Sequence, residues 1–262
     1  MATIVVIGAL DTKGAEIQFV KEQIQGRGHK TVVVDTGVLG EPVFSPDITR
    51  QDVAKAGGAD LAALVAKNDR GTAVSAMSKG AEVIAQRLLQ EGRVDAIIGM
   101  GGGAGTSVGT AAMRALPLGI PKVMVSTLAG SDVRGYVGVK DICMVPAIVD
   151  ISGLNSISRG VFARAAGAVC GMVEAKVPEG GGDKPMIVAS MFGNTTKCVE
   201  AARAIVENAG FEVLTFHAVG SGGQTMESLI EAGHIAGVLD VTTTEWADER
   251  SEEHTSELQS RF

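Results

Sequence analysis

A glycine-rich run offers the clearest site for chemistry in this sequence. The run from Gly99 to Ser107 contains five glycines and lies between an apolar, β-branched segment and a segment with helical periodicity. Glycines let backbone N–H groups converge on an anion, and the N-terminus of the following helix adds positive potential. The run therefore predicts a phosphate or carboxylate site, with a packing turn in which only glycine fits as the alternative. The predicted contacts are Gly101, Gly102, Gly103, Gly105, Thr106 and Ser107.

Sequence motifs narrow the chemistry of this run. No G-x-x-x-x-G-K-[ST] motif occurs, which excludes the usual P-loop ATPase. The Gly99-x-Gly101-x-x-Ala104 pattern matches a dinucleotide fingerprint, but the next predicted strand ends without an acid for the ribose. Ser107 also matches a nucleophile elbow, yet it lies several residues beyond the strand end where the elbow requires it. A hydrolase is therefore disfavoured.

Charged and polar residues follow the first two predicted strands. Lys13 can meet a phosphate as a point charge, and Asp11, next to Thr12, can bind a metal or a hydroxyl. Helix capping by Asp11 with a solvated Lys13 is an equal alternative. Asp35 ends the second strand, where a ribose-binding acid often lies, and turn formation is equally compatible with its position.

Further polar loops complete the set of candidates. Ser126 and Thr127 end a strand and predict a polar rim opposite the glycine run, and Asp132 is a candidate acid or Mg²⁺ contact. His217 follows another strand and is a second catalytic candidate, although a lone histidine is more often structural. Two later loops precede helices and predict anion contacts, with ordinary capping as the alternative. They contribute Gly193, Asn194, Thr195 and Thr196, and Gly222 and Gly223.

The elements that must position these loops alternate along the chain. Apolar runs predict strands over 3–8, 31–35, 94–99 and 122–126, and helical spacing predicts helices over 14–26, 75–92, 106–116 and 156–177. A Pro- and Gly-rich linker over 178–185 precedes a second series, with strands over 186–191, 212–216 and 236–241 and helices over 197–208 and 225–232. This order predicts an α/β fold of two Rossmann-like, doubly wound and mostly parallel subdomains, over 1–177 and 186–249.

Composition restricts the possible partners. The net charge of −7 and the absence of a basic cluster argue against nucleic acid as the main partner. No stretch of 18 apolar residues occurs, so no membrane span is predicted. The three cysteines have no metal-ligand spacing, so no metal site is predicted from them, and they are typical of reduced thiols in a cytoplasmic protein.

The last residues differ from the rest. Residues 250–262 contain only two apolar residues and resemble the translation of a sequencing-library adapter. We therefore expect a non-native tail that should be left out of fold reasoning, and an incomplete second subdomain.

Several segments together resemble the Tm-one-like ATP-binding family. They are 8–14, 105–107, 112–127, 149–155, 216–223 and 238–248, within a resemblance that covers residues 1–249. The resemblance implies two Rossmann-like subdomains, ATP binding and a homodimer. Together with the glycine loops of both subdomains, it leads us to expect ATP with Mg²⁺ in the cleft between them. The segment 129–132 departs from the pattern of the family, which leaves the role of Ser131 open.

Three functions compete on these grounds. The first is an ATP-dependent enzyme acting on a small carboxylate substrate, and the second is a non-catalytic module in which ATP regulates an interaction. The third is a hydrolase or lyase that uses His217 with Ser107 or Asp132 and needs no nucleotide. The glycine loops favour the first two, between which the sequence does not decide.

Overall fold

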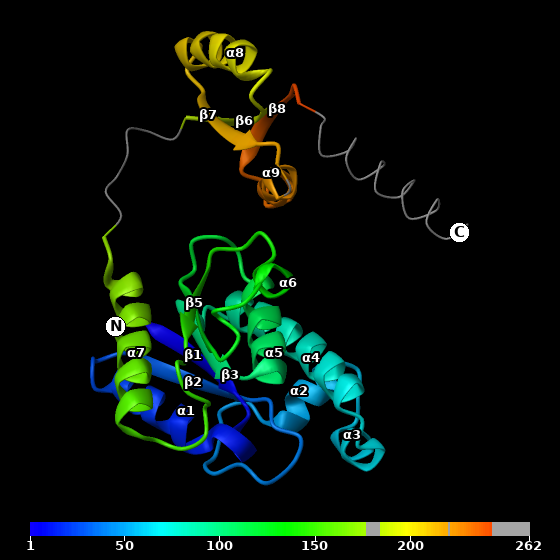
Figure 1. The fold of residues 1–262 in the computed structure, drawn as a ribbon, viewed down its shortest axis with the longest axis vertical. Helices are drawn as coiled ribbons and strands as arrows, with labels where there is room; N and C mark the ends of the chain where they lie inside the picture. Colours follow the sequence, from blue (N-terminus) through cyan, green and yellow to red (C-terminus); the bar gives the residue numbers. More distant parts are fainter. Residues whose placement is uncertain (177–183, 220, 243–262) are drawn as a thin grey trace. The chain divides into compact units, whose positions relative to one another are not determined.

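The computed structural model describes residues 1–176, 184–219 and 221–242 (Figure 1). The chain divides into two compact units, Met1–Lys176 and Val177–Phe262, and each is treated separately. Helices and strands alternate in both units, and all strand pairs are parallel. The predicted α/β class is therefore confirmed. The tail 250–262 and most of the linker 178–185 lie outside the described residues, so their assignment stays a prediction.

A five-stranded sheet forms the centre of the first unit. Its strands are β1 (Thr3–Gly8), β2 (Lys30–Asp35), β3 (Ala96–Gly101), β4 (Lys122–Ser126) and β5 (Ile142–Pro146). They follow the order β2-β1-β3-β4-β5, a doubly wound arrangement. Every residue of β3 and β4 is buried, because helices cover both faces of a parallel sheet and leave no polar face.

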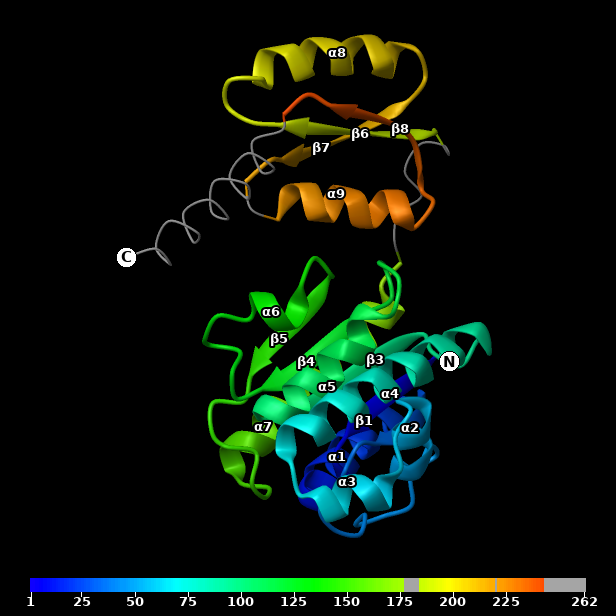
Figure 2. The ribbon, with the colours of Figure 1, turned by 90° about the vertical axis from the view of Figure 1, so that its right-hand side faces the viewer.

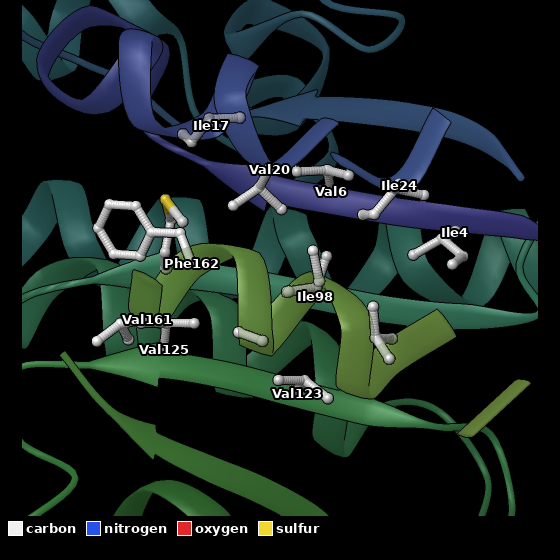
Figure 3. Close-up of a cluster of buried hydrophobic side chains, with 14 of the residues drawn as sticks. Ile4, Val6, Ile17, Val20, Ile24, Ile98, Val123, Val125, Val161 and Phe162 are labelled. Atoms are coloured by element: carbon white, nitrogen blue, oxygen red, sulfur yellow. The ribbon is translucent and has the colours of Figure 1, made fainter. Parts of the chain in front are cut away.

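Helices cover the two faces of this sheet. One layer is α1 (Leu10–Gln25) with α7 (Ser156–Glu174), and Figure 3 shows Ile17, Val20 and Phe162 packing from these helices onto the strands. The other layer contains four helices, which share a second buried cluster with the strands. These are α2 (Arg50–Ala56), α3 (Leu61–Lys67), α4 (Arg70–Gln90) and α5 (Gly103–Arg114), while the short α6 (Arg134–Val137) precedes β5.

Two differences from the sequence prediction affect the site. Strand β5 was not predicted, because it lies at the edge of the sheet, is only half-buried and so has a weak apolar pattern. Helix α5 begins at Gly103 rather than at residue 106, so the second half of the glycine run belongs to the first turn of a helix.

A buried lysine lies at the edge of the sheet where the strands begin. The Lys122 ammonium is fully buried and donates to the carbonyl oxygens of Pro117 (2.7 Å) and Ile120 (2.8 Å) and to Asp141 Oδ1 (2.7 Å). Burial lowers the pKa of Lys122, and the hydrogen bond that its ammonium donates to Asp141 opposes that shift. These three acceptors account for the burial of the Lys122 ammonium without a ligand.

The second unit repeats the beginning of the first on a smaller scale. It contains β6 (Met186–Met191), α8 (Thr196–Asn208), β7 (Glu212–His217), α9 (Gly222–Glu231) and β8 (Ile235–Asp240). The strand order is β7-β6-β8, which matches β2-β1-β3, and Figure 2 shows α8 and α9 on opposite faces of this sheet. No helix within the described ranges is long and apolar enough to cross a membrane.

Candidate functional site

The first unit has a pocket at the point where the strand order of its sheet reverses direction. Strands are added to one side of β1 and then to the other, so the connections after β1 and β3 leave on opposite faces and open a crevice beyond their carboxyl ends. A cavity of about 610 Å³ lies here. It is lined by residues that follow β1, β2 and β3, and by α3, α4 and α5.

The N-terminus of α5 faces this cavity without a side-chain cap. Gly102 is the N-cap residue and makes no side-chain hydrogen bond, and Thr106 N donates to Gly102 O at 2.8 Å. The N–H groups of the first helical turn before this bond have no acceptor within the helix. They belong to Gly103, Ala104 and Gly105, all of which line the cavity. An anion site requires free donors of this kind, and anion binding at the glycine run stays a prediction.

The glycines of the run serve two different purposes. A Cβ on Gly101 would lie 2.7 Å from the Cα of Gly105, so the close approach of α5 to β3 requires glycine there. A Cβ on Gly102 or Gly103 would find its nearest neighbour at 3.6 Å or 3.9 Å, which is ordinary contact. The packing alternative therefore accounts for Gly101, whereas Gly102 and Gly103 keep space open beside the free N–H groups.

The hydroxyl groups around the run are mostly used within the fold. Thr106 is 0% exposed, and its Oγ1 lies 2.7 Å from the Oγ of the buried Ser126, which also accepts a hydrogen bond from Leu128 N (3.0 Å). Ser107 Oγ donates to Gly103 O at 3.0 Å. Thr127 is exposed. The hydrogen bond between Thr106 and Ser126 thus joins α5 to β4 and supports the glycine run on the side away from the cavity.

The beginning of α1 forms a second wall. Asp11 Oδ2 accepts hydrogen bonds from Leu39 N (2.7 Å) and Gly40 N (3.1 Å), while its Oδ1 is buried without a partner among the described residues. The Lys13 ammonium donates to Ile151 O, and the backbone of Lys13 departs from helical geometry. The N-cap residue of α1 is Ala9, so Asp11 instead fastens the loop that follows β2.

Asp35 has a structural position at the end of β2. It is 1% exposed, and its Oδ1 accepts hydrogen bonds from Leu10 N (3.0 Å) and Gly37 N (2.9 Å). The carboxylate thus accepts from the first N–H of α1 and stabilises the turn after β2. This agrees with turn formation, one of the two roles that the sequence allowed for Asp35. Burial raises the pKa of Asp35, and these two hydrogen bonds oppose the shift.

The raised pKa of Asp35 predicts a particular pH dependence of stability. Its contribution to stability is fully present below the unfolded pKa of 3.8 and is lost as the pH rises through the higher folded pKa. We expect Asp35→Asn to become more stable relative to the wild type between about pH 4 and pH 7, by about 1.4 kcal/mol for each pKa unit. Urea unfolding across this range measures the difference, and a difference that does not change with pH would contradict the assignment.

The remaining wall of the cavity is largely apolar and was not predicted. At the mouth, Leu39 is 76% exposed and Val65 is 50% exposed, and Met77 is buried on α4. No local pattern marks these residues as a site, because the helices that carry them only meet the glycine run in the tertiary structure. The apolar lining residues are Val38, Leu39, Leu64, Val65, Ala73, Val74, Met77 and Val108.

Charged residues of both signs also line the cavity. The carboxylates are Asp11, Asp69 and Asp150, and the cations are Lys13 and Arg70. Asp69 is the N-cap of α4 and accepts a hydrogen bond from Thr72 N at 2.6 Å. Hydrogen bonds from the side chain and then the backbone of Thr72 lower the pKa of Asp69. Arg70, Asp69 and Asp150 had no signal in the sequence beyond their residue types.

The two catalytic candidates, Asp132 and His217, belong to different units of the chain. Asp132 is exposed, does not line this cavity and pairs with Arg134 (2.6 Å), whose hydrogen bonds lower the Asp132 pKa to about 2. A general acid needs a pKa near the working pH, so this carboxylate is unsuited to that role. In the second unit, the exposed His217 ring lies against Phe192, with 5.5 Å between the ring centroids.

The loops predicted in the second unit are held by internal hydrogen bonds. Thr195 Oγ1 lies 2.6 Å from Thr242 Oγ1 and also bonds the backbone of Phe192, and Thr196 Oγ1 donates to Phe192 O at 3.1 Å. Gly193 and Asn194 are exposed between β6 and α8. A Cβ on Gly222 would overlap His217 O and lie 2.8 Å from the carbonyl carbon, so glycine is needed there for packing, and Gly223 follows in the first turn of α9.

Comparisons with known proteins identify the family. Residues 2–178 match the N-terminal domain and residues 184–262 the C-terminal domain of the "Uncharacterised protein family (UPF0261)". A UPF0261 protein of Clostridium tetani (strain Massachusetts / E88) is 52% identical over 246 residues, which cover 94% of this chain and 61% of that protein. A UPF0261 protein of Rhizobium meliloti (strain 1021) is 45% identical over 95% of this chain and 61% of its own length.

A plant protein is also similar. The "ToMV susceptible protein tm-1(GCR26)" of Solanum lycopersicum is 34% identical over 92% of this chain and 35% of its own length. The chain thus spans 61% of the length of the two bacterial relatives and a smaller part of the plant protein. With both domains matched and relatives above 30% identity, the chain belongs to the UPF0261 family, which includes relatives of the tomato protein.

Proposed function

We propose that the first unit binds ATP with Mg²⁺ in the cavity beyond the carboxyl ends of β1 and β3. The observation that carries the proposal is the uncapped N-terminus of α5, whose free N–H groups face a cavity of about 610 Å³ with an apolar opposite wall. One end of this cavity suits an anion and the other a flat apolar group, as a nucleotide requires. The participation of the second unit stays a prediction, and so do the homodimer, the cytoplasmic location and the small carboxylate substrate.

The phosphate groups would lie against Gly102, Gly103 and Gly105. The N–H groups of the first turn of α5 donate hydrogen bonds, and the helix dipole favours negative charge at this end. Gly102 and Gly103 carry no side chain that would separate a phosphate from these donors. Charge-assisted hydrogen bonds of this kind are about twice as strong as neutral ones.

The base would lie against the apolar wall. Residues 73, 74 and 77 of α4, together with Val108 of α5, present aliphatic side chains along the two helices that flank the cavity. Burying a flat ring there removes apolar surface from water at about 25 cal/mol per Å². The exposed Leu39 and Val65 at the mouth would become covered by the ligand.

The carboxylates of the cavity fit a magnesium ion. Asp11 and Asp150 supply oxygen ligands, which Mg²⁺ prefers, and the buried Oδ1 of Asp11 lacks a partner in the described structure. Among the described residues no group of three His, Cys, Asp or Glu is placed to hold a metal. This fits an ion that takes most of its ligands from phosphates and water. When bound, Mg²⁺ would offset the repulsion between the phosphates and the carboxylates.

Thermal and urea unfolding of the full chain, with and without MgATP, MgADP, AMP and NAD, tests the proposal. A ligand at 100 times its dissociation constant stabilises the folded state by about 2.7 kcal/mol, and we expect this for MgATP. Omission of Mg²⁺ should reduce the effect. Absence of stabilisation by every nucleotide would contradict the proposal.

Phosphate release from the same samples separates the two ATP-dependent functions. Steady release above background that is lost in Gly103→Leu, whose position lines the cavity, would favour an enzyme, and binding without release would favour a regulatory module. None of the described residues that line the cavity is a histidine or a cysteine. Acid–base chemistry there would therefore depend on the carboxylates or Lys13.

A further inference from the structure

We propose that Arg70 is a specificity-determining residue that binds the phosphate chain of the nucleotide from the wall opposite the glycine run. This inference rests on the proposed function, because it assigns a residue to the same cavity. Arg70 belongs to none of the sequence motifs described above. Three features of Arg70 support the assignment: its position in α4, the common direction of α4 and α5, and the absence of a partner for its guanidinium within the described residues.

Arg70 lies on the face of α4 that lines the cavity. It is the first residue of the helix, and residues 73, 74 and 77 line the cavity with it. Positions i, i+3, i+4 and i+7 of a helix share one face, so this stripe runs along the cavity wall. Met77 is 1% exposed whereas Arg70 is exposed, so the stripe leads from a buried apolar end to a charged end at the surface.

The two helices that flank the cavity point the same way. Helix α5 follows β3 and α4 precedes it, so both run from the carboxyl edge of the sheet toward its amino edge. The two helices pack against each other along the same face of the sheet (Figure 2). Arg70 and the free N–H groups of α5 therefore lie at the same end of two neighbouring helices, with the apolar residues farther along.

The guanidinium of Arg70 is available to a ligand. Within the described part of the chain it makes no hydrogen bond and no ion pair, whereas Lys13, the other cation of the cavity, donates to Ile151 O. A phosphate bound to the N-terminus of α5 would be met by Arg70 from the side of α4. Arginine presents a planar fork of donors that matches two phosphate oxygens, which an ammonium does not.

Affinity measurements on the full chain with adenosine, AMP, ADP and ATP, with Mg²⁺ present, test this assignment. We expect Arg70→Ala to weaken MgATP binding about 10- to 100-fold, the effect of removing hydrogen bonds to a charged group. Binding of adenosine should not change, because the base and ribose do not reach Arg70. Arg70→Lys should recover only part of the loss, since it restores the charge but not the fork.

Arg159→Ala is the matched control. Arg159 is also an exposed arginine in the first turn of a long helix of the same unit, but it does not line the cavity. Its removal matches the change in net charge and should leave MgATP affinity unaltered. If the wild type binds MgATP and Arg70→Ala binds it equally well, or loses adenosine and ATP equally, Arg70 does not bind the phosphates. If the wild type binds no nucleotide, the proposed function itself fails.

Discussion

Replacing Gly103 by leucine is expected to lower the affinity for MgATP at least about 100-fold while the first unit stays folded. Gly103 is the first residue of α5 and lines the cavity, and a Cβ there would meet only Leu128 Cδ1 at 3.9 Å. The leucine side chain would therefore extend into the space assigned to a phosphate. Losing two charge-assisted hydrogen bonds of about 1.5 to 3 kcal/mol each is enough for this effect.

Calorimetric titration with MgATP measures the loss, and urea unfolding shows whether the fold is retained. Gly171→Leu is the control, because Gly171 is an exposed helical glycine of α7 with nothing within 4 Å of a Cβ. It should bind MgATP like the wild type. Equal affinity in Gly103→Leu would show that the phosphates do not lie at the N-terminus of α5.

Gly80→Ala is expected to destabilise the first unit by about 3 kcal/mol, although alanine is the better helix former. Gly80 lies within α4, and a Cβ there would overlap the carbonyl oxygen of Val53 and lie 2.8 Å from its carbonyl carbon. These are backbone atoms of α2, which cannot rotate away as a side chain can. The strain of overpacking should exceed the gain of up to about 1 kcal/mol in helix propensity.

The matched substitution Gly171→Ala should have the opposite sign. With open space at that position, only the propensity term acts, and we expect a stabilisation of about 0.5 to 1 kcal/mol. Urea unfolding of both variants at neutral pH gives the comparison. A Gly80→Ala protein as stable as the wild type would show that α2 and α4 are not held as closely as the structure places them.

The Gly103→Leu and Gly80→Ala variants together separate effects on ligand binding from effects on packing. Gly80 holds α4 against α2, and α4 in turn carries Arg70 and Met77 along the cavity. Gly103 has no packing requirement of its own. Loss of MgATP binding in Gly103→Leu without loss of stability is therefore evidence about the site itself.

The alternation of strands and helices could be predicted from the sequence, because it depends on local patterns. Short β-branched runs bounded by glycine, such as Thr3–Gly8, favour buried strands, and glycines with polar residues after them mark where the chain turns. The glycine run could also be recognised from the sequence as a candidate site, because all of its residues lie in one continuous segment. It missed β5, because an edge strand needs less burial and so carries a weaker pattern.

The roles of individual side chains depended on contacts between distant segments. Asp11 and Asp35 are carboxylates after neighbouring strands, yet one holds residues 39–40 and the other the first N–H of α1. Thr106 meets Ser126, twenty residues away, instead of the cavity. No local pattern distinguishes a hydroxyl that braces a loop from one that faces a ligand.

Short-range spacing and the conformational freedom of glycine were thus enough to predict the fold class and the position of the candidate anion-binding loop. The residues that lie opposite this loop could be identified only from the packing of distant segments. The strand order reverses between β1 and β3, and α3 and α4 therefore lie beside the N-terminus of α5. These two helices contribute the apolar wall and Arg70. A cavity is made by surfaces from several elements, so its chemistry emerges only when those elements pack.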